Sequence, residues 1–320
     1  MSYGDPVTER ANECVVALLD GTVQSVDVPL LRPDDLAVLR GEGVFETTLA
    51  VDGEPRDLDD HLARLAVSAE LTDVVVPEPD RWRTAVEAGL AAWSSGRSPD
   101  GPAPDEAVVR LIAPRGPEGA PEAAGYVMVS ALPAVSRRQR ATGVRVVLLD
   151  RGFTPSGAAA APWLLAQAKT LSYGINMAAL RWARSQGADD AVFVAGGADA
   201  THRSAGEREV LEAPTSSVVL ARRTPSGERT LVTPTLDGVL DGITVRRLLA
   251  AAGAAGWATT RATVTIDDLH AADGIWLVSS ARLLAPVTAI DGIARDDGDL
   301  TREIAALLDV PGGGTGPASA

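Results

Sequence analysis

Cysteine and histidine are scarce in this chain. Cys14 is the only cysteine among 320 residues, which excludes an intramolecular disulfide and any metal cage built from thiolates. The three histidines, His61, His202 and His270, are scattered and show no close ligand spacing. We therefore expect no metal site.

Long apolar runs and net positive charge are also missing. The longest apolar stretch, roughly residues 158–168, is interrupted by Pro162 and is too short to span a bilayer. The N-terminus lacks a basic region followed by an apolar one. The formal net charge of −14 repels phosphate backbones and anionic lipids. We expect a soluble, cytoplasmic protein that acts on a small molecule, without nucleic-acid or membrane partners.

Lysine is nearly absent. Lys169 is the only lysine among 29 basic residues, which leaves 28 arginines. Arginine replaces lysine in solvation and ion pairing, but its guanidinium stays protonated and cannot serve as an amine nucleophile. Chance could leave one lysine in such a composition. The alternative is a chemical requirement for an amine at position 169.

The first part of the chain is typical of an α+β unit. Turn signals at Asp20-Gly21 and Asp52-Gly53 predict two hairpins. Apolar spacing predicts helices over 59–71 and 80–93, and β-rich runs predict strands over 107–113 and 125–131. We place this domain at residues 1–132, followed by a polar interdomain linker over 133–142.

The rest of the chain predicts a larger C-terminal domain over 143–310 and a disordered tail over 311–320. A helix is expected over 173–186, ending at Gly187, and another helix begins at Gly242-Ile243-Thr244. The remaining expected elements are strands over 144–149, 191–194, 215–222, 229–233, 259–265 and 275–278, and a helix over 267–272.

Several short motifs in a fixed order resemble the class IV aminotransferase family over roughly residues 15–292. The run Lys169-Thr170-Leu171-Ser172-Tyr173 is similar to the segment that carries the family's Schiff-base lysine. The resemblance implies a two-domain enzyme of fold type IV, with pyridoxal 5'-phosphate as cofactor. It also implies a homodimer, with the active site between the two domains.

The resemblance assigns a carboxylate to the pyridine nitrogen of the cofactor. Glu212, in Leu211-Glu212-Ala213-Pro214, matches the family's glutamate, which keeps the ring protonated. Glu207 and Glu209 are competing candidates. Ser216 is expected to contact the cofactor as well. The interval from 195 to 210 looks long for the family.

Three further motifs resemble phosphate-binding positions. His61-Leu62-Ala63-Arg64-Leu65 matches a motif whose arginine binds the phosphate. Ile243 and Thr244 begin a helix, where backbone N–H groups and the helix dipole favour an anion. Ser280 aligns with a phosphate-binding hydroxyl.

Substrate contacts are expected from the first domain and from one late motif. In Gly43-Val44-Phe45-Glu46-Thr47, strand alternation sends Phe45 and Thr47 to the face opposite Glu46. Thr47, Arg110 and Arg282 are our candidates for contacting substrate, with Arg115 as a further possible carboxylate clamp.

The family catalyses both amino transfer and elimination. The Ser280-Ala281-Arg282 form and the Glu46-Thr47-Thr48 ending resemble the lyases, so we rank aminodeoxychorismate lyase first, a step toward folate. An L-amino-acid (branched-chain) transaminase is second and a D-amino-acid transaminase third. A catalytically degenerate binding homologue is the non-enzymatic alternative, which the retention of Lys169 disfavours.

Overall fold

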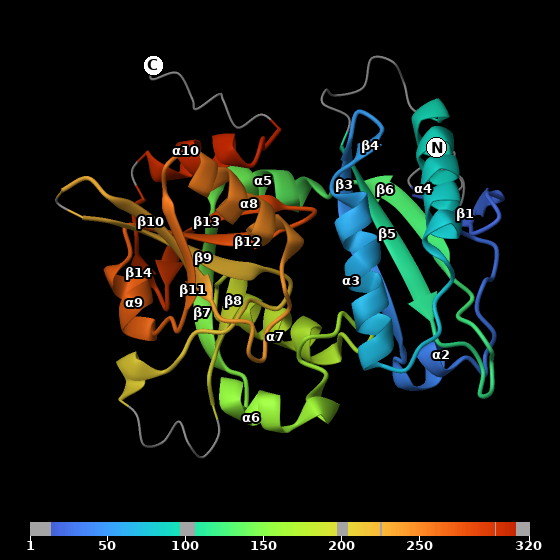
Figure 1. Cartoon of the computed structure of the whole chain (residues 1–320), viewed down its shortest axis with the longest axis horizontal. Helices are drawn as coiled ribbons and strands as arrows, with labels where there is room; N and C mark the ends of the chain where they lie inside the picture. Colours follow the sequence, from blue (N-terminus) through green and yellow to red (C-terminus); the bar gives the residue numbers. More distant parts are fainter. Residues whose placement is uncertain (1–13, 97–105, 197–203, 225, 298, 312–320) are drawn as a thin grey trace, which may run out of the picture. The chain divides into compact units, whose positions relative to one another are not determined.

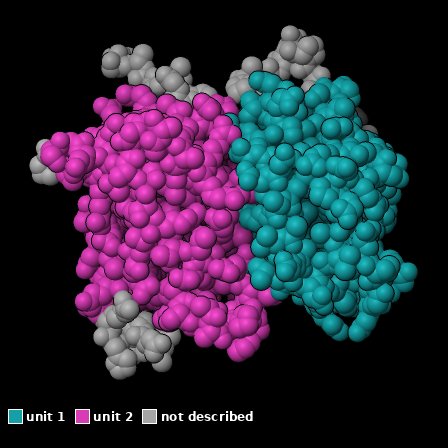
Figure 2. Space-filling view, viewed as in Figure 1, with its two compact units in different colours: residues 1–133, 168–173 teal, residues 134–167, 174–320 magenta. Residues whose placement is uncertain are grey.

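The computed structural model describes residues 14–96, 106–196, 204–224, 226–297 and 299–311. The chain divides into two compact units, coloured separately in Figure 2. The first unit contains residues 1–133 and 168–173, and the second contains residues 134–167 and 174–320. Both units combine sheets with helices, as we predicted.

The first unit is built on a six-stranded antiparallel sheet with the order β2-β1-β6-β5-β3-β4 (Figure 1). Its strands are β1 (Cys14–Leu18), β2 (Val23–Ser25), β3 (Gly43–Val51), β4 (Glu54–Pro55), β5 (Glu106–Pro114) and β6 (Tyr126–Ala131). Its helices are α2 (Leu36–Arg40), α3 (Leu58–Leu71) and α4 (Pro79–Ser95). Both predicted hairpins and both predicted helices of this part are present.

Helices α3 and α4 cover one face of this sheet (Figure 1). Leu62, Leu65 and Ala69 of α3 recur at helical spacing and are buried in one apolar core with the inward-facing residues of β3, β5 and β6. Trp82, Val86 and other residues of α4 complete this core. The alternate residues of each strand therefore face away from the two helices.

The second unit contains an eight-stranded mixed sheet. Seven of its strands lie side by side in the order β11-β10-β9-β12-β13-β7-β8, and β14 pairs with β13. Its strands are β7 (Val144–Asp150), β8 (Asp190–Val194), β9 (Ser217–Arg223), β10 (Arg229–Pro234), β11 (Ala258–Ala262), β12 (Gly274–Ser279), β13 (Leu283–Ile290) and β14 (Ile293–Ala294). Its helices are α5 (Ala134–Thr142), α6 (Pro155–Ala160), α7 (Gly174–Ser185), α8 (Ile243–Ala254), α9 (Ile266–Ala271) and α10 (Leu300–Leu307), with 3-10 turns η1 (Pro162–Leu164) and η3 (Ala205–Glu207).

Two apolar cores lie on opposite faces of this sheet. Val219, Ala221, Trp276 and Val278 pack with α8 and α10, whereas the alternate residues of β9 and β12 pack in a separate core with α9. Burial on both faces explains why β12 reads as an uninterrupted apolar run.

The domain boundaries differ from the predicted ones in two places. The predicted linker, 133–142, is helical over most of its length: residues 134–142 form α5, which belongs to the second unit. Residues 168–173, which we place in the C-terminal domain from sequence, belong to the first unit. From residue 312 onward, the predicted disordered tail lies outside the residues that the structure describes. Among the residues described, no helix combines the length and apolarity needed to cross a membrane.

Candidate active site

Residues 168–173, here called the lysine segment, are hydrogen-bonded to the start of β3. The amide of Phe45 donates to the carbonyl of Lys169 at 3.1 Å, and the amide of Leu171 donates to the carbonyl of Gly43 at 2.9 Å. The amide of Lys169 itself donates to the buried hydroxyl of Ser68 on α3 at 3.0 Å. Backbone and helix contacts therefore fix the position of the only lysine.

Gly43 allows this close approach. Its φ is +143°, and a Cβ there would lie 2.6 Å from the carbonyl oxygen of Ala113 and 2.7 Å from a methyl carbon of Leu171. A larger residue would therefore push the lysine segment away from β3.

The amine of Lys169 lies against two aromatic rings. Its Nζ is 4.1 Å from the ring centroid of Phe45 and 5.7 Å from that of Tyr173. The two rings meet edge to face with their centroids 5.4 Å apart. Cation–π attraction holds an ammonium at such a site. The aromatic pair thus orients the predicted catalytic amine.

Phe45 and Thr47 point away from α3 and α4, on the face opposite Glu46, as strand alternation predicts. Register places Thr47 opposite Arg110, and Arg110 opposite Met128. These side chains, with Tyr126 beside them, are half-buried and share the face that carries Phe45. Tyr126 and Met128 are not among the predicted site residues, although the alternation of β6 could have indicated them.

Arg110 is held within this face. Its Nη1 donates to the hydroxyl of Ser130 at 3.2 Å. Burial lowers the pKa of Arg110, and the neighbouring Cys14 opposes that effect. By contrast, Arg115 forms an ion pair with Glu42 at 2.6 Å and donates to the carbonyls of Thr72 and Asp73. Arg110 is therefore the better placed of the two for a ligand on this face.

On the helix-covered face, Glu46 binds two side chains of α3. Its fully buried carboxylate accepts from Nε and Nη2 of Arg64 at 2.7 and 2.8 Å and lies 2.7 Å from Nδ1 of His61. Burial alone would raise the pKa of Glu46, but the charge and hydrogen bonds of Arg64, together with His61, lower it to about 2. Arg64 is thus oriented by Glu46.

In the second unit, Glu212 lies at the end of a short backbone ladder with β8. Phe193 and Glu212 are hydrogen-bonded through their backbones, and a Glu212 carboxylate oxygen accepts from the amide of Leu240 at 3.2 Å. The guanidinium of Arg151 stacks on Phe193 with 4.8 Å to the ring centroid. Burial lowers the pKa of Arg151, and the negative charge of Glu212 opposes this. Glu212 thus lies beside a cation.

The competing glutamate Glu207 has a different partner. Its carboxylate accepts from the amide and the hydroxyl of Ser204, both at 2.9 Å, and caps η3. This local cap accounts for Glu207 and favours Glu212 as the carboxylate with a functional role. Residues 197–203, in the interval that looks long from sequence, lie outside the described residues.

A set of donors gathers at the start of α8. Thr244 Oγ1 lies 3.2 Å from the hydroxyl of Ser280, and the first amides of the helix have no intrahelical acceptor. A Cβ on Gly242 would lie 2.6 Å from the hydroxyl of Ser217, so the bare backbone leaves room there. The acidic neighbour Asp241 is paired with Arg261 at 2.8 Å. The chemistry of this donor set fits a phosphate.

Arg282 does not have the position expected of a substrate clamp. Its buried guanidinium donates to Asp190 and Gln139, each at 3.0 Å, and to Ser216 at 2.8 Å. These internal partners hold the guanidinium inside the second unit, so a structural role fits it better than the predicted contact with substrate. Motif likeness locates the residue but does not reveal such partners.

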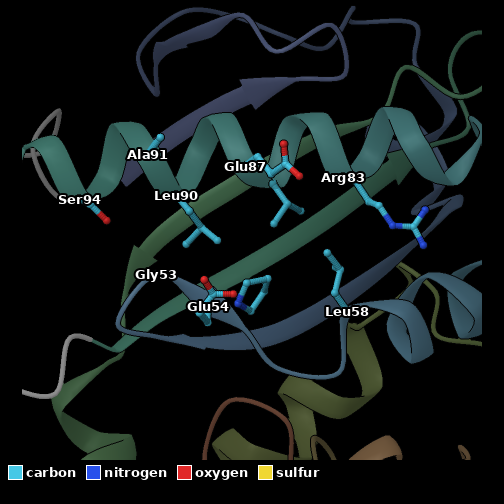
Figure 3. Close-up of a pocket in the computed structure, with 10 residues that line it drawn as sticks. Gly53, Glu54, Leu58, Arg83, Glu87, Leu90, Ala91 and Ser94 are labelled. Carbon is cyan, nitrogen blue, oxygen red and sulfur yellow. The ribbon is translucent and has the colours of Figure 1, made fainter.

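The predicted residues therefore form two groups. Lys169, Thr47, Arg110 and Arg64 belong to the first unit, and Glu212, Ser216, Ile243, Thr244, Ser280 and Arg282 belong to the second. A groove of about 450 Å³ between the β3–β4 turn and α4 contains none of them (Figure 3). Within the described ranges, no three His, Cys, Asp or Glu side chains cluster as metal ligands would.

Comparison with known proteins places the chain in a family. The model of the amino-transferase class IV family matches residues 43–290. A Mycobacterium tuberculosis protein named bifunctional aminodeoxychorismate lyase / D-amino acid transaminase is 40% identical over 298 residues, or 92% of this chain and 98% of that protein. A D-alanine aminotransferase of Listeria monocytogenes is 27% identical over 81% of each chain.

The fold comparison agrees. A solved structure described as a hypothetical aminotransferase from Mycobacterium tuberculosis, in its PLP-bound form, has a TM-score of 0.83 and 41% identity. It covers 92% of this chain and 97% of its own. The predicted family, the predicted fold type and the predicted cofactor are confirmed. The chain belongs to the class IV aminotransferases, enzymes of fold type IV that depend on pyridoxal 5'-phosphate.

Proposed function

We propose that this enzyme is an aminodeoxychorismate lyase, which converts 4-amino-4-deoxychorismate into 4-aminobenzoate and pyruvate. The main support is the relative that is 40% identical across nearly its whole length and carries this activity in its name. The Ser280-Ala281-Arg282 and Glu46-Thr47-Thr48 motifs, which resemble the lyases, agree with it.

Bound pyridoxal phosphate supplies an aldehyde that condenses with amines and a ring that accepts an electron pair. We assign Lys169 to hold the cofactor through its amine and, with that amine free, to remove the proton from the amine-bearing ring carbon of the substrate. The enolpyruvyl group then leaves, its carbon–oxygen bond breaking as the substrate ring becomes aromatic. Protonation of the enolpyruvate yields pyruvate, so atoms balance without a co-substrate.

The other residues have binding roles in this proposal. Glu212 holds a proton at the pyridine nitrogen. The phosphate contacts are Arg64, the backbone of Ile243, Thr244 and Ser280, with Ser216 nearby. Thr47 and Arg110, paired across β3 and β5, face the substrate, and Arg110 attracts a carboxylate.

Transamination of D-amino acids is the second candidate. The same 40% identical relative carries this activity in its name, and the Listeria relative is named for D-alanine. These names favour D-amino acids over branched-chain L-amino acids, which reverses the order that the motifs predict. A degenerate binding homologue is disfavoured by the retention of Lys169 and Glu212.

The test supplies 4-amino-4-deoxychorismate without any keto acid and follows both products. Sustained release of 4-aminobenzoate and pyruvate in equal amounts is expected. A parallel reaction offers D- and L-amino acids with 2-oxoglutarate and measures glutamate. Turnover only in the second reaction would reject the lyase and identify the enzyme as a transaminase. The small-molecule substrate fits the family, whereas the cytoplasm and the homodimer stay predictions.

A further inference from the structure

The turn between β12 and β13, residues 280–282, needs support from its surroundings. The residue that follows it, Leu283, is buried and has a φ of +62°. A branched, non-glycine residue is uncommon in the left-handed region and stays there only when neighbouring contacts determine its conformation. Ser280 lies in this turn, and its hydroxyl is next to that of Thr244 in the proposed phosphate site.

One arginine supports the turn through its carbonyls. Arg140 of α5 donates from Nε to the carbonyl of Arg282 at 2.7 Å and from Nη2 to the carbonyl of Ala281 at 2.8 Å. Helix α5 has no buried residue among its nine, so apolar packing does not explain its place. The two hydrogen bonds connect α5 to the turn.

A second arginine ties the turn to its neighbours through its side chain. The Arg282 guanidinium donates to Asp190 at the start of β8 and to Gln139 of α5. The Arg282 and Asp190 side chains are only 9% and 3% exposed. A planar guanidinium can hold several acceptors in one fixed geometry, which a lysine cannot do.

Another donor of Arg282 reaches a second turn, the one that follows Glu212. Nη2 donates to the hydroxyl of Ser216 at 2.8 Å. Ser216 closes a turn with Ala213, whose amide donates to the Ser216 carbonyl at 2.7 Å, and Glu212 directly precedes that turn. One buried guanidinium thus connects the turn carrying Ser280 with the turn after Glu212.

We propose that Arg282, with Asp190 and Arg140, is a positioning device for the cofactor phosphate: it sets the turn that presents Ser280 beside Thr244. This inference rests on the proposed phosphate site and assigns Arg282 no contact with substrate. If the network were needed only for folding, its loss would weaken all ligands equally. If it positions Ser280, its loss weakens ligands that carry a phosphate.

The test compares two ligands that differ only in the phosphate. Purified apoprotein is titrated with pyridoxal phosphate and with pyridoxal, and the two dissociation constants are measured by absorbance. The main variant, Arg282→Met with Asp190→Asn, removes both buried charges together and so avoids an unpaired one. We expect about a ten-fold or greater loss of affinity for pyridoxal phosphate, the range of one charge-assisted interaction, and less than about a two-fold change for pyridoxal.

Two further variants separate positioning from stability. Arg282→Lys keeps the charge beside Asp190 but cannot reach all three acceptors, so its melting temperature should stay near wild type while phosphate selectivity falls. Arg140→Gln removes only the bonds to the turn carbonyls and should shift selectivity in the same direction. The control, Arg229→Met with Glu303→Gln, removes an ion pair between β10 and α10 and should leave the ratio of the two constants unchanged.

The outcomes are distinct. Loss of affinity for both ligands in parallel, or an unchanged ratio in all three test variants, would overturn the positioning role. Failure of the wild-type protein to prefer pyridoxal phosphate over pyridoxal would reject the proposed phosphate site, and this inference with it.

Discussion

Glu46 is a fully buried carboxylate whose pKa is lowered by its two partners on α3. Its carboxylate is buried, with Arg64 and His61 as partners, and its pKa falls from 4.5 to about 2. A lowered pKa means that the folded state favours the ionised form. The stabilisation is therefore complete above pH 4.5 and is lost as the pH falls toward 2.

Glu46→Gln should abolish that part of the pH dependence. The wild-type free energy of unfolding should drop by roughly 3 kcal/mol between pH 5 and pH 2 from this group, because one pKa unit corresponds to about 1.4 kcal/mol. At neutral pH the variant should be less stable by about 3–5 kcal/mol, since Arg64 keeps a charge without its carboxylate. Denaturant unfolding at several pH values measures both effects.

Asp34→Asn is the control for this measurement. Asp34 pairs with Arg32 at 2.8 Å, but both side chains are exposed, so water screens the pair. Its loss should leave the slope of stability against pH unchanged. An equal change of slope in both variants would contradict the special role of the buried carboxylate.

Lys169→Arg should keep the positive charge and eliminate turnover, because a guanidinium does not condense with an aldehyde. Borohydride reduction of the wild-type holoenzyme should attach a phosphopyridoxyl group to this side chain. Since no other lysine exists, peptide mapping has one side-chain target. Wild-type activity in the variant, or a label found elsewhere in the chain, would refute the assignment.

Single residues differ in how far sequence alone could assign them. Lys169 is recognisable because amine chemistry is the property that arginine lacks. The role of Arg282 is not recognisable, because the chain has 28 arginines and nothing in the sequence indicates which of them has buried partners. Only the fold shows that Arg282 lies next to Asp190 and Ser216. The link between Glu46 and Arg64 joins a strand to a helix, and alternation along β3 predicts the face of Glu46 but not the side chain that meets it.

Among the elements, β3 makes the contacts that position Lys169. Its first residue, Gly43, lies under the lysine segment, and its Phe45 lies beside the amine. We expect Gly43→Ala to destabilise the protein by roughly 2–4 kcal/mol, because the new Cβ meets backbone atoms at a φ that suits only glycine. Displacement of the lysine segment should also slow cofactor attachment, which absorbance can follow.

Gly53→Ala is the matched control in the same hairpin. Gly53 also has a positive φ, +84°, but a Cβ there would meet nothing within 4 Å. Its cost should be limited to the backbone strain, roughly 1–2 kcal/mol, with cofactor attachment unchanged. Equal attachment rates in the two variants would show that the close contact at Gly43 does not matter for the site.

The elements that were predictable are those with a buried face. Both hairpins had Asp-Gly turns, and α3 and α4 had apolar residues at helical spacing. Helix α5 buries no residue and its sequence is strongly polar, so the segment reads as a linker. Polar contacts hold α5 in place: Gln139 and Arg140 are hydrogen-bonded to the β12–β13 turn.

The family resemblance predicts that the enzyme is a homodimer. Sedimentation should then give twice the chain's 33.1 kDa, about 66 kDa, at micromolar concentration. With a net charge of −14, low salt strengthens repulsion between copies, so raising the salt should favour association. A monomer at every salt concentration would reject the prediction.

The chain passes between its two units more than once, because the lysine segment returns to the first unit after residues 134–167 have joined the second. On the ribosome, a nascent chain ending at residue 133 still lacks the lysine segment, which is hydrogen-bonded to the start of β3. Until residue 171 has been synthesised, the amide of Phe45 and the carbonyl of Gly43 cannot both form those bonds. The first unit, although encoded first, is therefore finished only midway through translation, and a gene fragment cut at its boundary would express a sheet without the lysine segment.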